Sequence, residues 1–187
     1  MERKSESQKV DPLFLERWSP RAFESTPIPS EDRNCLFEAA RWAPSCYNEQ
    51  PWHFVYAKNA VGKEKILHTL VDANRVWAAR APLLIIVFCR KNFVKTQKPN
   101  DWAAFDAGSA WMSFALQALK LGYHTHAMAG FSKEKAYHAT GLSKEKYYPM
   151  AVIAVGKKGK KSLLPDPLQK AEYPNQRKKA EEFTQAL

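Results

Sequence analysis

The chain has 187 residues, of which 45% are hydrophobic and 12% aromatic, so it can fill the core of one folded domain and is not disordered throughout. Its formal net charge of +10 favours an anionic partner, and nucleic acid, an anionic membrane surface or a small phosphorylated ligand would each fit. The three cysteines form no CxxC pair, which argues against a disulfide framework or a cysteine zinc site and fits a reducing compartment.

The longest dense apolar run, residues 82–89, is far shorter than the roughly 20 residues that span a bilayer. Residues 1–9 are charged and polar and do not resemble a secretory signal. We therefore expect a soluble, cytoplasmic protein with no membrane partner. Residues 1–10 predict a flexible N-terminal tail, and residues 11–187 predict one domain with no internal repeat.

The first helix is expected at Asp11, because Pro12 would then occupy its first position. The segment that follows reads Arg17-Trp18-Ser19-Pro20-Arg21. Pro20 disfavours helical geometry at the preceding residue, and an extended segment would point Arg17, Ser19 and Arg21 to one side. Two guanidiniums and a hydroxyl on one side suit a phosphate, although a solvated basic loop has the same composition.

A second helix is predicted with Ser30 as its cap, with Glu31 and Asp32 favourably placed in its first turn and an apolar stripe that ends at Ala43. The loop after it is framed by two prolines that stiffen the backbone. Its hydroxyl and amide groups, suited to a polar heteroaromatic ligand, belong to Ser45, Asn48 and Gln50, and the framing prolines are Pro44 and Pro51.

Further along the chain, hydrophobic periodicity predicts alternating strands and helices. Residues 83–89 are rich in Val and Ile without clean alternation, which predicts a central strand covered on both faces. The other predicted strands are residues 53–57, 123–129 and 150–155, and the predicted helices are residues 62–71, residues 101–121 with Asp101 as cap and Gly122 as terminator, and a short helix capped by Ser132.

The helix at residues 101–121 is apolar or small around most of its circumference. Such a helix must be covered on many sides, either by the core or by a second subunit, and both readings stay open. Residues 92–100 predict a polar surface loop that borders a pocket. A basic run at residues 157–161 precedes a Pro-rich extension, which we expect to lie across another surface.

Several common catalytic motifs are absent, including the Rossmann glycine fingerprint, the phosphate loop and HExxH. His124 and His126 would share a strand face, and packing or surface roles are favoured over metal binding because no third ligand is spaced nearby. Cys46 lacks a specific basic partner and is read as a packed thiol. Gly130 follows a strand and precedes a helix, where backbone amides could approach a ligand, which is a weak signal alone.

Taken together, these motifs make the chain similar to the FMN-dependent nitroreductase family from about residue 13 to residue 183. Residues 17–21 match the family's R-x-S-x-R opening, residues 43–52 match its A-P-S-x-x-N-x-Q-P-W signature, and residues 128–131 match its M-x-G-F turn. The long helix from Asp106 to Gly122 and the basic pair Arg177-Lys178 also follow the family order.

The resemblance implies an α+β fold with a mainly antiparallel central sheet wrapped by helices. It also implies an intertwined homodimer in which the C-terminal segment reaches the partner subunit and two FMN sites lie at the interface. Arg17, Ser19, Arg21 and Arg177 would hold the cofactor from one subunit. Pro44, Ser45 and Asn48 would come from the partner, and Ala129 and Gly130 would present backbone amides near the flavin ring.

The implied activity is ping-pong hydride transfer from NAD(P)H through FMN to a nitroaromatic, a quinone or a similar small oxidant. Because FMN carries the chemistry, no catalytic side chain is expected. Two alternatives remain: a flavin-binding module that stores or senses FMN without turnover, and nucleic-acid binding through the basic tail. No aromatic-plus-basic reading surface recurs along the chain, so nucleic acid is disfavoured.

Overall fold

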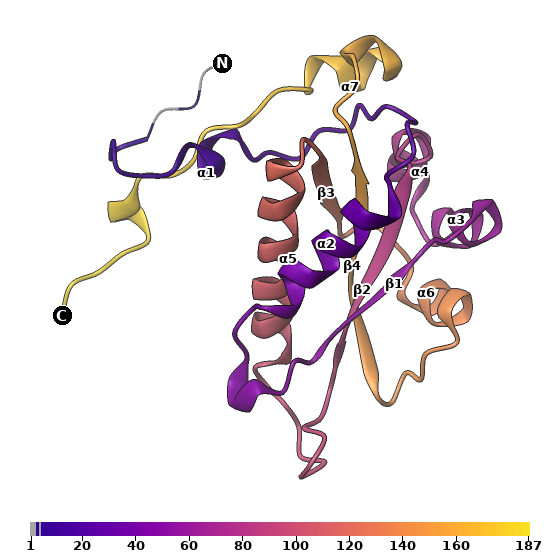
Figure 1. Ribbon diagram of the computed structural model, residues 1–187, viewed down its shortest axis with the longest axis vertical. Helices are drawn as coiled ribbons and strands as arrows, with labels where there is room; N and C mark the ends of the chain where they lie inside the picture. The colour runs from indigo at the N-terminus through magenta and orange to yellow at the C-terminus, as the bar shows by residue number, and fades with distance from the viewer. Residues whose placement is uncertain (1–2, 4) are drawn as a thin grey trace.

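The computed structural model describes residues 3 and 5–187. A four-stranded sheet forms its centre, and helices cover both faces of that sheet (Figure 1). The elements in chain order are α1 (Pro12–Glu16), α2 (Ser30–Arg41), η1 (Cys46–Asn48), β1 (Trp52–Tyr56), α3 (Ala60–Leu67), α4 (Asp72–Ala78), β2 (Leu83–Arg90), α5 (Ala103–Lys120), β3 (His124–Met128), α6 (Lys133–Thr140), β4 (Tyr147–Gly156), η2 (Lys161–Leu163), α7 (Asp166–Lys170) and η3 (Ala180–Glu182).

The strands are ordered β1-β2-β4-β3, and each neighbouring pair is antiparallel. The predicted antiparallel α+β fold is therefore confirmed. The centre of the sheet is the long pairing of β2 with β4, in which Ile85 lies opposite Ile153, and its register shifts between Val87 and Phe88. Strand β3 forms one edge of the sheet, where it pairs with β4.

Side chains alternate along β2 and feed two separate cores. Leu84, Ile86 and Phe88 pack toward α3, α4 and α6, while Leu83, Ile85 and Val87 pack toward α2 and α5. All six are nearly fully buried. The prediction of a central strand covered on both faces is confirmed, and its unbroken apolar run follows from burial on both sides.

The predicted helix over residues 62–71 is confirmed only in part, because α3 ends at Leu67 and a second helix that was not predicted, α4, begins at Asp72. The chain leaves helical geometry where its backbone bonds to another segment. Val71 N donates to Gly130 O at 3.1 Å, Ser132 N donates to Thr69 O at 2.7 Å, and Leu70 forms an isolated bridge with Phe131. These bonds replace the next helical turn and attach the segment to the turn after β3.

Two predicted helix caps also differ from the structure. The predicted cap Ser30 is the first residue of α2, and the N-cap position is taken by Pro29, which makes no side-chain capping hydrogen bond. The N-cap of α5 is Trp102 rather than Asp101, and it has no side-chain capping bond; just before the helix, Asn100 Oδ1 accepts from Trp102 N at 3.1 Å. The predicted terminator holds, since Gly122 has a φ of +80°.

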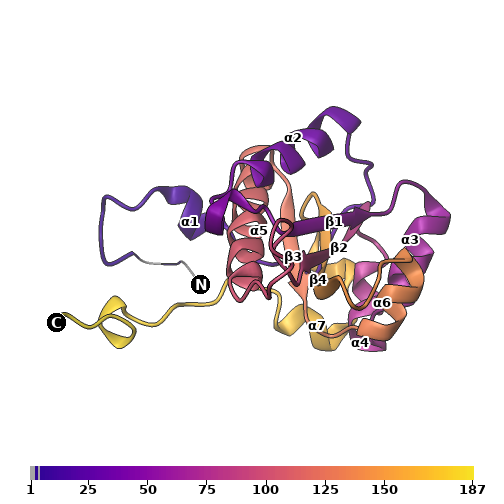
Figure 2. The same ribbon diagram turned by 90° about the horizontal axis from the view of Figure 1, so that it is seen from below.

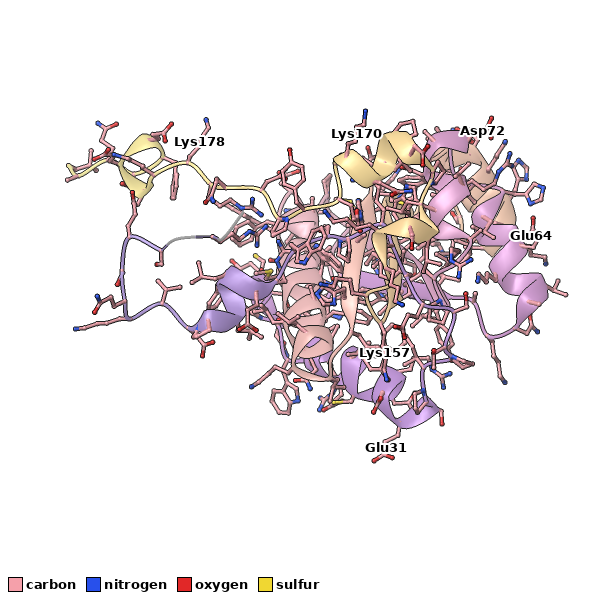
Figure 3. The ribbon with its side chains drawn as sticks, turned by 90° about the horizontal axis from the view of Figure 1, so that it is seen from above. Glu31, Glu64, Asp72, Lys157, Lys170 and Lys178 are labelled. Carbon is pink, nitrogen blue, oxygen red and sulfur yellow. The ribbon has the colours of Figure 1, made fainter. Side chains whose placement is uncertain are left out.

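Both ends of the chain form arms that extend away from the body on the side of α5 (Figure 2). Figure 3 shows Lys178 on the C-terminal arm, far from the end of the body that carries Glu64 and Asp72. The arms lie side by side, because Arg3 Nε donates to Asn175 O at 2.9 Å and Ala180 N donates to Glu6 Oε2 at 3.2 Å. Residues 175–187 are exposed in the single chain.

Helix α5 faces the core on one side and presents apolar side chains to solvent on the other. Ala110, Phe114 and Ala118 are buried, whereas Trp102 is 58% and Phe105 73% exposed. Together with the partly exposed Met112, these side chains recur at three- and seven-residue intervals on the outer face. None of the described helices is long and apolar enough to cross a membrane.

Candidate functional site

The clearest candidate site is a cavity of about 340 Å³ that gathers four arginines, here called the arginine pocket. Arg17 and Arg21 come from the extended segment after α1, and Arg177 and Arg3 come from the two arms. The remaining lining residues are Trp18, Ser19, His126, Ala171, Tyr173 and Asn175. Among the described residues that line it there is no Asp or Glu, so its guanidinium charge is available to an anion.

The basic run at residues 157–161 fixes the segment that carries Arg17 and Arg21. Glu24 N donates to Lys157 O at 2.9 Å, and Gly159 N donates to Ala22 O at 2.8 Å. Phe23, fully buried, forms a bridge with Lys158. The backbone of the run, rather than its charge, therefore attaches the arginine segment to the end of β4.

A buried carboxylate completes this anchoring. Glu172 is 2% exposed, and its Oε1 accepts from Arg21 N at 2.8 Å and from Ala22 N at 2.9 Å. Two backbone donors compensate the burial of the charge. The carboxylate thus holds the peptide of Arg21 and leaves the Arg21 side chain pointing into the pocket.

Arg3 is held in place by backbone carbonyls rather than by an acid. Its Nη1 donates to Leu15 O at 2.9 Å and to Arg17 O at 2.6 Å. Burial, followed by the guanidiniums of Arg177 and Arg17, lowers the pKa of Arg3, and burial followed by Arg177 lowers the pKa of Arg17. These shifts indicate that positive charges are crowded together, and a bound anion would relieve that crowding.

Two histidines on β3 pack beside the pocket. His126 Nδ1 lies 2.9 Å from Pro20 O, and its ring is 4.6 Å from that of Trp77, centroid to centroid. Burial lowers the pKa of His126, and burial followed by Lys158 and Arg17 lowers the pKa of His124 to about 4. Within the described part of the chain no three metal-ligating side chains gather. His124 packs on Trp18, and His126 packs on Trp77 while it also lines the pocket.

The loop at residues 44–50 lies at the other end of α5 from the arginine pocket. Cys46 N donates to Asp106 Oδ2 at 3.1 Å near the start of α5, whereas Trp18 packs on His124, just beyond the end of α5. Asp106 and Lys120 are 14 residues apart on α5, which corresponds to about 20 Å. In one chain the loop and the pocket are therefore well separated; Figure 1 shows the segment after α1 near the upper end of α5 and the segment before β1 near its lower end.

The loop is rigid and strained. Tyr47, Asn48 and Gln50 adopt φ values of 51°, 56° and 49°, in the left-handed region that favours glycine. Ser45 Oγ accepts from Gln50 N at 3.0 Å, and Gln50 Nε2 donates to Asn48 Oδ1 at 3.1 Å. Pro44 and Asn48 are exposed, so the loop presents a fixed polar edge to the outside of this chain.

The turn after β3 brings Ala129 and Gly130 beside α4. Gly130 O accepts from Val71 N and from Asn74 Nδ2, each at 3.1 Å. A Cβ added at Gly130 would lie 2.6 Å from Asn74 Nδ2 and 3.0 Å from Val71 Cγ2, so a larger residue would require Asn74 to move. This turn is four residues beyond His126 on the same edge strand.

The predicted site residues thus fall into three groups. Arg17, Ser19, Arg21 and Arg177 share the arginine pocket. Ala129 and Gly130 lie at the end of β3 and do not line the pocket, and Pro44, Ser45 and Asn48 lie in the distant loop.

Sequence reasoning missed Arg3, Glu172, Tyr173 and Asn175. Arg3 was assigned to a tail, and Glu172 lies in a Pro-rich extension where no periodicity indicated burial. No signal in the sequence distinguished Glu172 from the other acids of the extension, Asp166, Glu181 and Glu182.

An antiparallel α+β fold with an arginine pocket beside its edge strand fits the class of proteins that bind an anionic ligand. The comparisons with known proteins identify the family. The nitroreductase family model matches residues 15–76 and 57–157, more than half of the chain. The chain belongs to the nitroreductase family.

Individual relatives agree with this assignment. A Bacillus subtilis (strain 168) protein named "Putative NAD(P)H nitroreductase YdgI" is 27% identical over 165 residues, which cover 70% of this chain and 78% of that protein. A crystal structure described as an oxidoreductase containing FMN is 38% identical, has a TM-score of 0.90, and covers 97% of this chain and 93% of its own. An Exiguobacterium sibiricum protein solved in complex with FMN has the same fold, with 21% identity, a TM-score of 0.80 and coverage of 98% of this chain and 100% of its own.

Proposed function

We propose that this chain is an FMN-dependent oxidoreductase that takes electrons from NAD(P)H and delivers them to a nitroaromatic, a quinone or a similar small oxidant. The observation that carries the proposal is the arginine pocket, a cluster of four guanidiniums with no acid among its described lining. A phosphate monoester carries about −1.5 to −2 charges at pH 7 and three acceptor oxygens, which suits such a cluster.

The position of the pocket on β3 supports an elongated ligand. His126 lines the pocket, and Gly130 follows four residues later, or about 13 Å along an extended strand. A cofactor with a phosphate at one end and a ring system at the other fits this separation. Arg17, Ser19, Arg21, Arg177 and Arg3 would hold the phosphate end, and the turn at Ala129 and Gly130 would lie beside the ring.

Bound FMN would accept a hydride from NAD(P)H and pass the electrons on, so that NAD(P)H and a proton convert a quinone into a hydroquinone and NAD(P)⁺. The protein's own contribution is to bind, orient and stabilise negative charge. The arginines provide positive potential at one end, and the backbone of the turn, held by Asn74 and Val71, provides a fixed surface at the other. No acid or nucleophilic side chain is needed for this role.

We further propose that the active form is a homodimer in which the loop at residues 44–50 completes the site of the partner subunit. Two observations support this. The exposed face of α5, with Trp102 and Phe105, is an apolar surface that a second copy would cover. The strained loop presents Pro44 and Asn48 outward at the same end of α5, about 20 Å from its own arginine pocket.

Anaerobic reduction of the purified protein tests the proposal. We expect the protein to be yellow and its flavin absorbance to bleach on addition of NADH or NADPH, and then to return on addition of a quinone or a nitroaromatic. A colourless protein that fails to bind added FMN would refute the proposal. A flavin that stays oxidised with both nucleotides in excess would favour the alternative, a flavin-storage or flavin-sensing protein.

A further inference from the structure

A second cleft, separate from the arginine pocket, lies between the loop at residues 45–50 and the turn at residues 92–99. It has a volume of about 520 Å³ and is lined by Tyr47, Glu49, Phe93, Lys95, Lys98 and Pro99, together with Thr96. Figure 1 shows both segments at the lower end of α5, and the bond from Val94 N to Glu49 Oε1 joins them. We call it the aromatic cleft; its volume is in the usual range of small-molecule sites, about 300–1,000 Å³.

Aromatic rings form the apolar part of this cleft. Tyr47 is 91% exposed, and its ring meets that of Phe93 edge to face, with centroids 6.2 Å apart. A tyrosine so exposed contributes little to the core of this chain. Its flat face is available to stack on a planar ring, an arrangement that aromatic pairs favour.

The walls of the cleft are fixed before any ligand arrives. Gln97 has a φ of 57°, and with Tyr47, Asn48 and Gln50 it completes the set of non-glycine residues with positive φ in the described chain. Phe93 N donates to Lys98 O at 2.9 Å, which closes the turn. Glu49 Oε1 accepts from Val94 N and so joins the two walls. Rigid walls reduce the entropy lost on binding.

The rim of the cleft is positively charged. Lys95 and Lys98 project from the turn, and both are exposed. The sole acid among the described lining residues is Glu49, which faces Arg90 at 3.9 Å and is partly neutralised by it. The cleft therefore combines a flat apolar surface with excess positive charge, which is complementary to an aromatic ring that carries an anionic group.

We propose that the aromatic cleft selects oxidants that are planar aromatic anions, such as nitroarene carboxylates, in which the nitro group accepts the electrons, with the ring against Tyr47 and Phe93 and the anionic group near Lys95 and Lys98. This inference rests on the proposed function, because Asn48, next to Tyr47, is the residue we assign to the partner's flavin site. NADPH also combines a planar aromatic ring, its adenine, with an anionic group, its 2′-phosphate. The experiment must therefore distinguish binding of the oxidant from binding of NADPH.

The test uses FMN-loaded full-length protein and two oxidants of the same skeleton, nitrobenzene and para-nitrobenzoate. The variant is Lys95→Ala/Lys98→Ala. The matched control is Lys58→Ala/Lys135→Ala, which removes the same charge from exposed positions outside the cleft. A third variant, Phe93→Leu, removes the aromatic wall and keeps both lysines. Each protein is assayed with NADH and with NADPH at two salt concentrations.

We expect the KM for para-nitrobenzoate to rise about tenfold in the Lys95/Lys98 variant, the scale of two partly exposed ion pairs, and the difference to shrink in high salt. The KM for nitrobenzene should stay within about twofold in that variant. Phe93→Leu should raise both KM values, and the control should change neither. If the KM for NADPH rises relative to NADH while that for para-nitrobenzoate does not, the cleft binds the nucleotide and the proposal is overturned.

Calorimetric titration separates this proposal from the proposed function. Para-nitrobenzoate should bind the FMN-loaded protein more tightly than nitrobenzene, and the Lys95/Lys98 variant should lose that preference even if the protein proves to have no turnover. If wild type and variant bind the two compounds equally, the cleft has no anion selectivity and the inference is wrong, whatever the enzymatic activity.

Discussion

The arginine pocket and the loop at residues 44–50 carry the two most specific motifs of the sequence, yet they reach their positions differently. The pocket is assembled within one chain from the segment after α1 and from both arms, and a buried carboxylate and strand-like pairing hold it. The loop does not line the arginine pocket of its own chain, and it keeps its shape through left-handed backbone, its own hydrogen bonds and its bonds to Asp106 and Val94. An arginine pocket built within one chain and a preformed loop about 20 Å away are what we expect if, as proposed, one functional site is divided between two chains.

The largest expected effect comes from breaking the pocket with Arg17→Ala. Loss of a charge-assisted contact to phosphate should weaken FMN binding by about 1.5–3 kcal/mol, or roughly 10- to 100-fold. Quenching of flavin fluorescence on titration into the apoprotein measures this affinity. Arg80→Ala, an exposed arginine outside the pocket, is the control and should leave the affinity unchanged. An Arg17 variant with wild-type affinity would show that the pocket is not the phosphate site.

Low pH should reduce the stability of the folded protein through His124, which lies beside the arginine pocket. His124 packs on Trp18 and stays neutral down to a pKa of about 4, whereas the histidine of an unfolded chain takes up its proton near 6.5. The unfolded state therefore binds more protons between these values, and stability falls as the pH drops from 6.5 to 4. Because water partly screens the ring, we expect this histidine to contribute about 2 kcal/mol of that loss.

Urea unfolding at pH 7.5 and pH 5 would measure this dependence in wild type and in His124→Gln. The variant should lose part of the difference between the two pH values, since its side chain does not titrate. An identical pH dependence in both proteins would mean that His124 is not the group responsible.

A smaller effect is expected from breaking the loop with Asn48→Gly. Glycine accepts the left-handed backbone at this position, so the change removes the side-chain amide without adding strain. FMN binding should weaken by about 1 kcal/mol, the scale of one neutral hydrogen bond, while the unfolding free energy of the protein should change by less than about 0.5 kcal/mol. FMN titration measures the affinity, and urea unfolding measures the stability. If the variant lost stability but kept its affinity for FMN, Asn48 would have a structural role only.

The smallest effect should come from Arg3→Ala, which removes the guanidinium supplied by the N-terminal arm. Arg3 is partly exposed, so we expect FMN affinity to fall by about threefold and to become less sensitive to salt. Lys9→Ala, an exposed cation of the same arm outside the pocket, should have no effect. If both variants behave alike, general positive charge rather than the position of Arg3 is what matters.

Most of the fold could be predicted because local patterns decided it. The apolar run of β2 indicated burial on two faces, and Gly122 marked the end of α5. The break between α3 and α4 could not be predicted, because it depends on backbone bonds from Thr69 and Val71 to a turn some 60 residues away, near Gly130. No glycine or proline marks that break in the sequence.

The site could be predicted only in part. Arg17, Ser19 and Arg21 alternate in an extended segment, so their common orientation followed from spacing alone, and Arg177 joins them in the same cavity. The contribution of Arg3 depends on where the N-terminal arm lies, and the role of Glu172 depends on two peptide groups about 150 residues away, at Arg21 and Ala22. Contacts between segments this distant leave no periodic trace in a single sequence.

The central claim, that one site is shared between two chains, is tested most directly by a mixed dimer. One subunit carries Arg17→Ala and the other Asn48→Gly, the two are co-expressed with different affinity tags, and the mixed species is titrated with FMN. If each site takes Arg17 from one chain and Asn48 from the other, both defects fall in one site and the second site is intact. We therefore predict one FMN site of wild-type affinity per mixed dimer, although neither homodimer has any. A mixed dimer with no site of wild-type affinity would contradict the account.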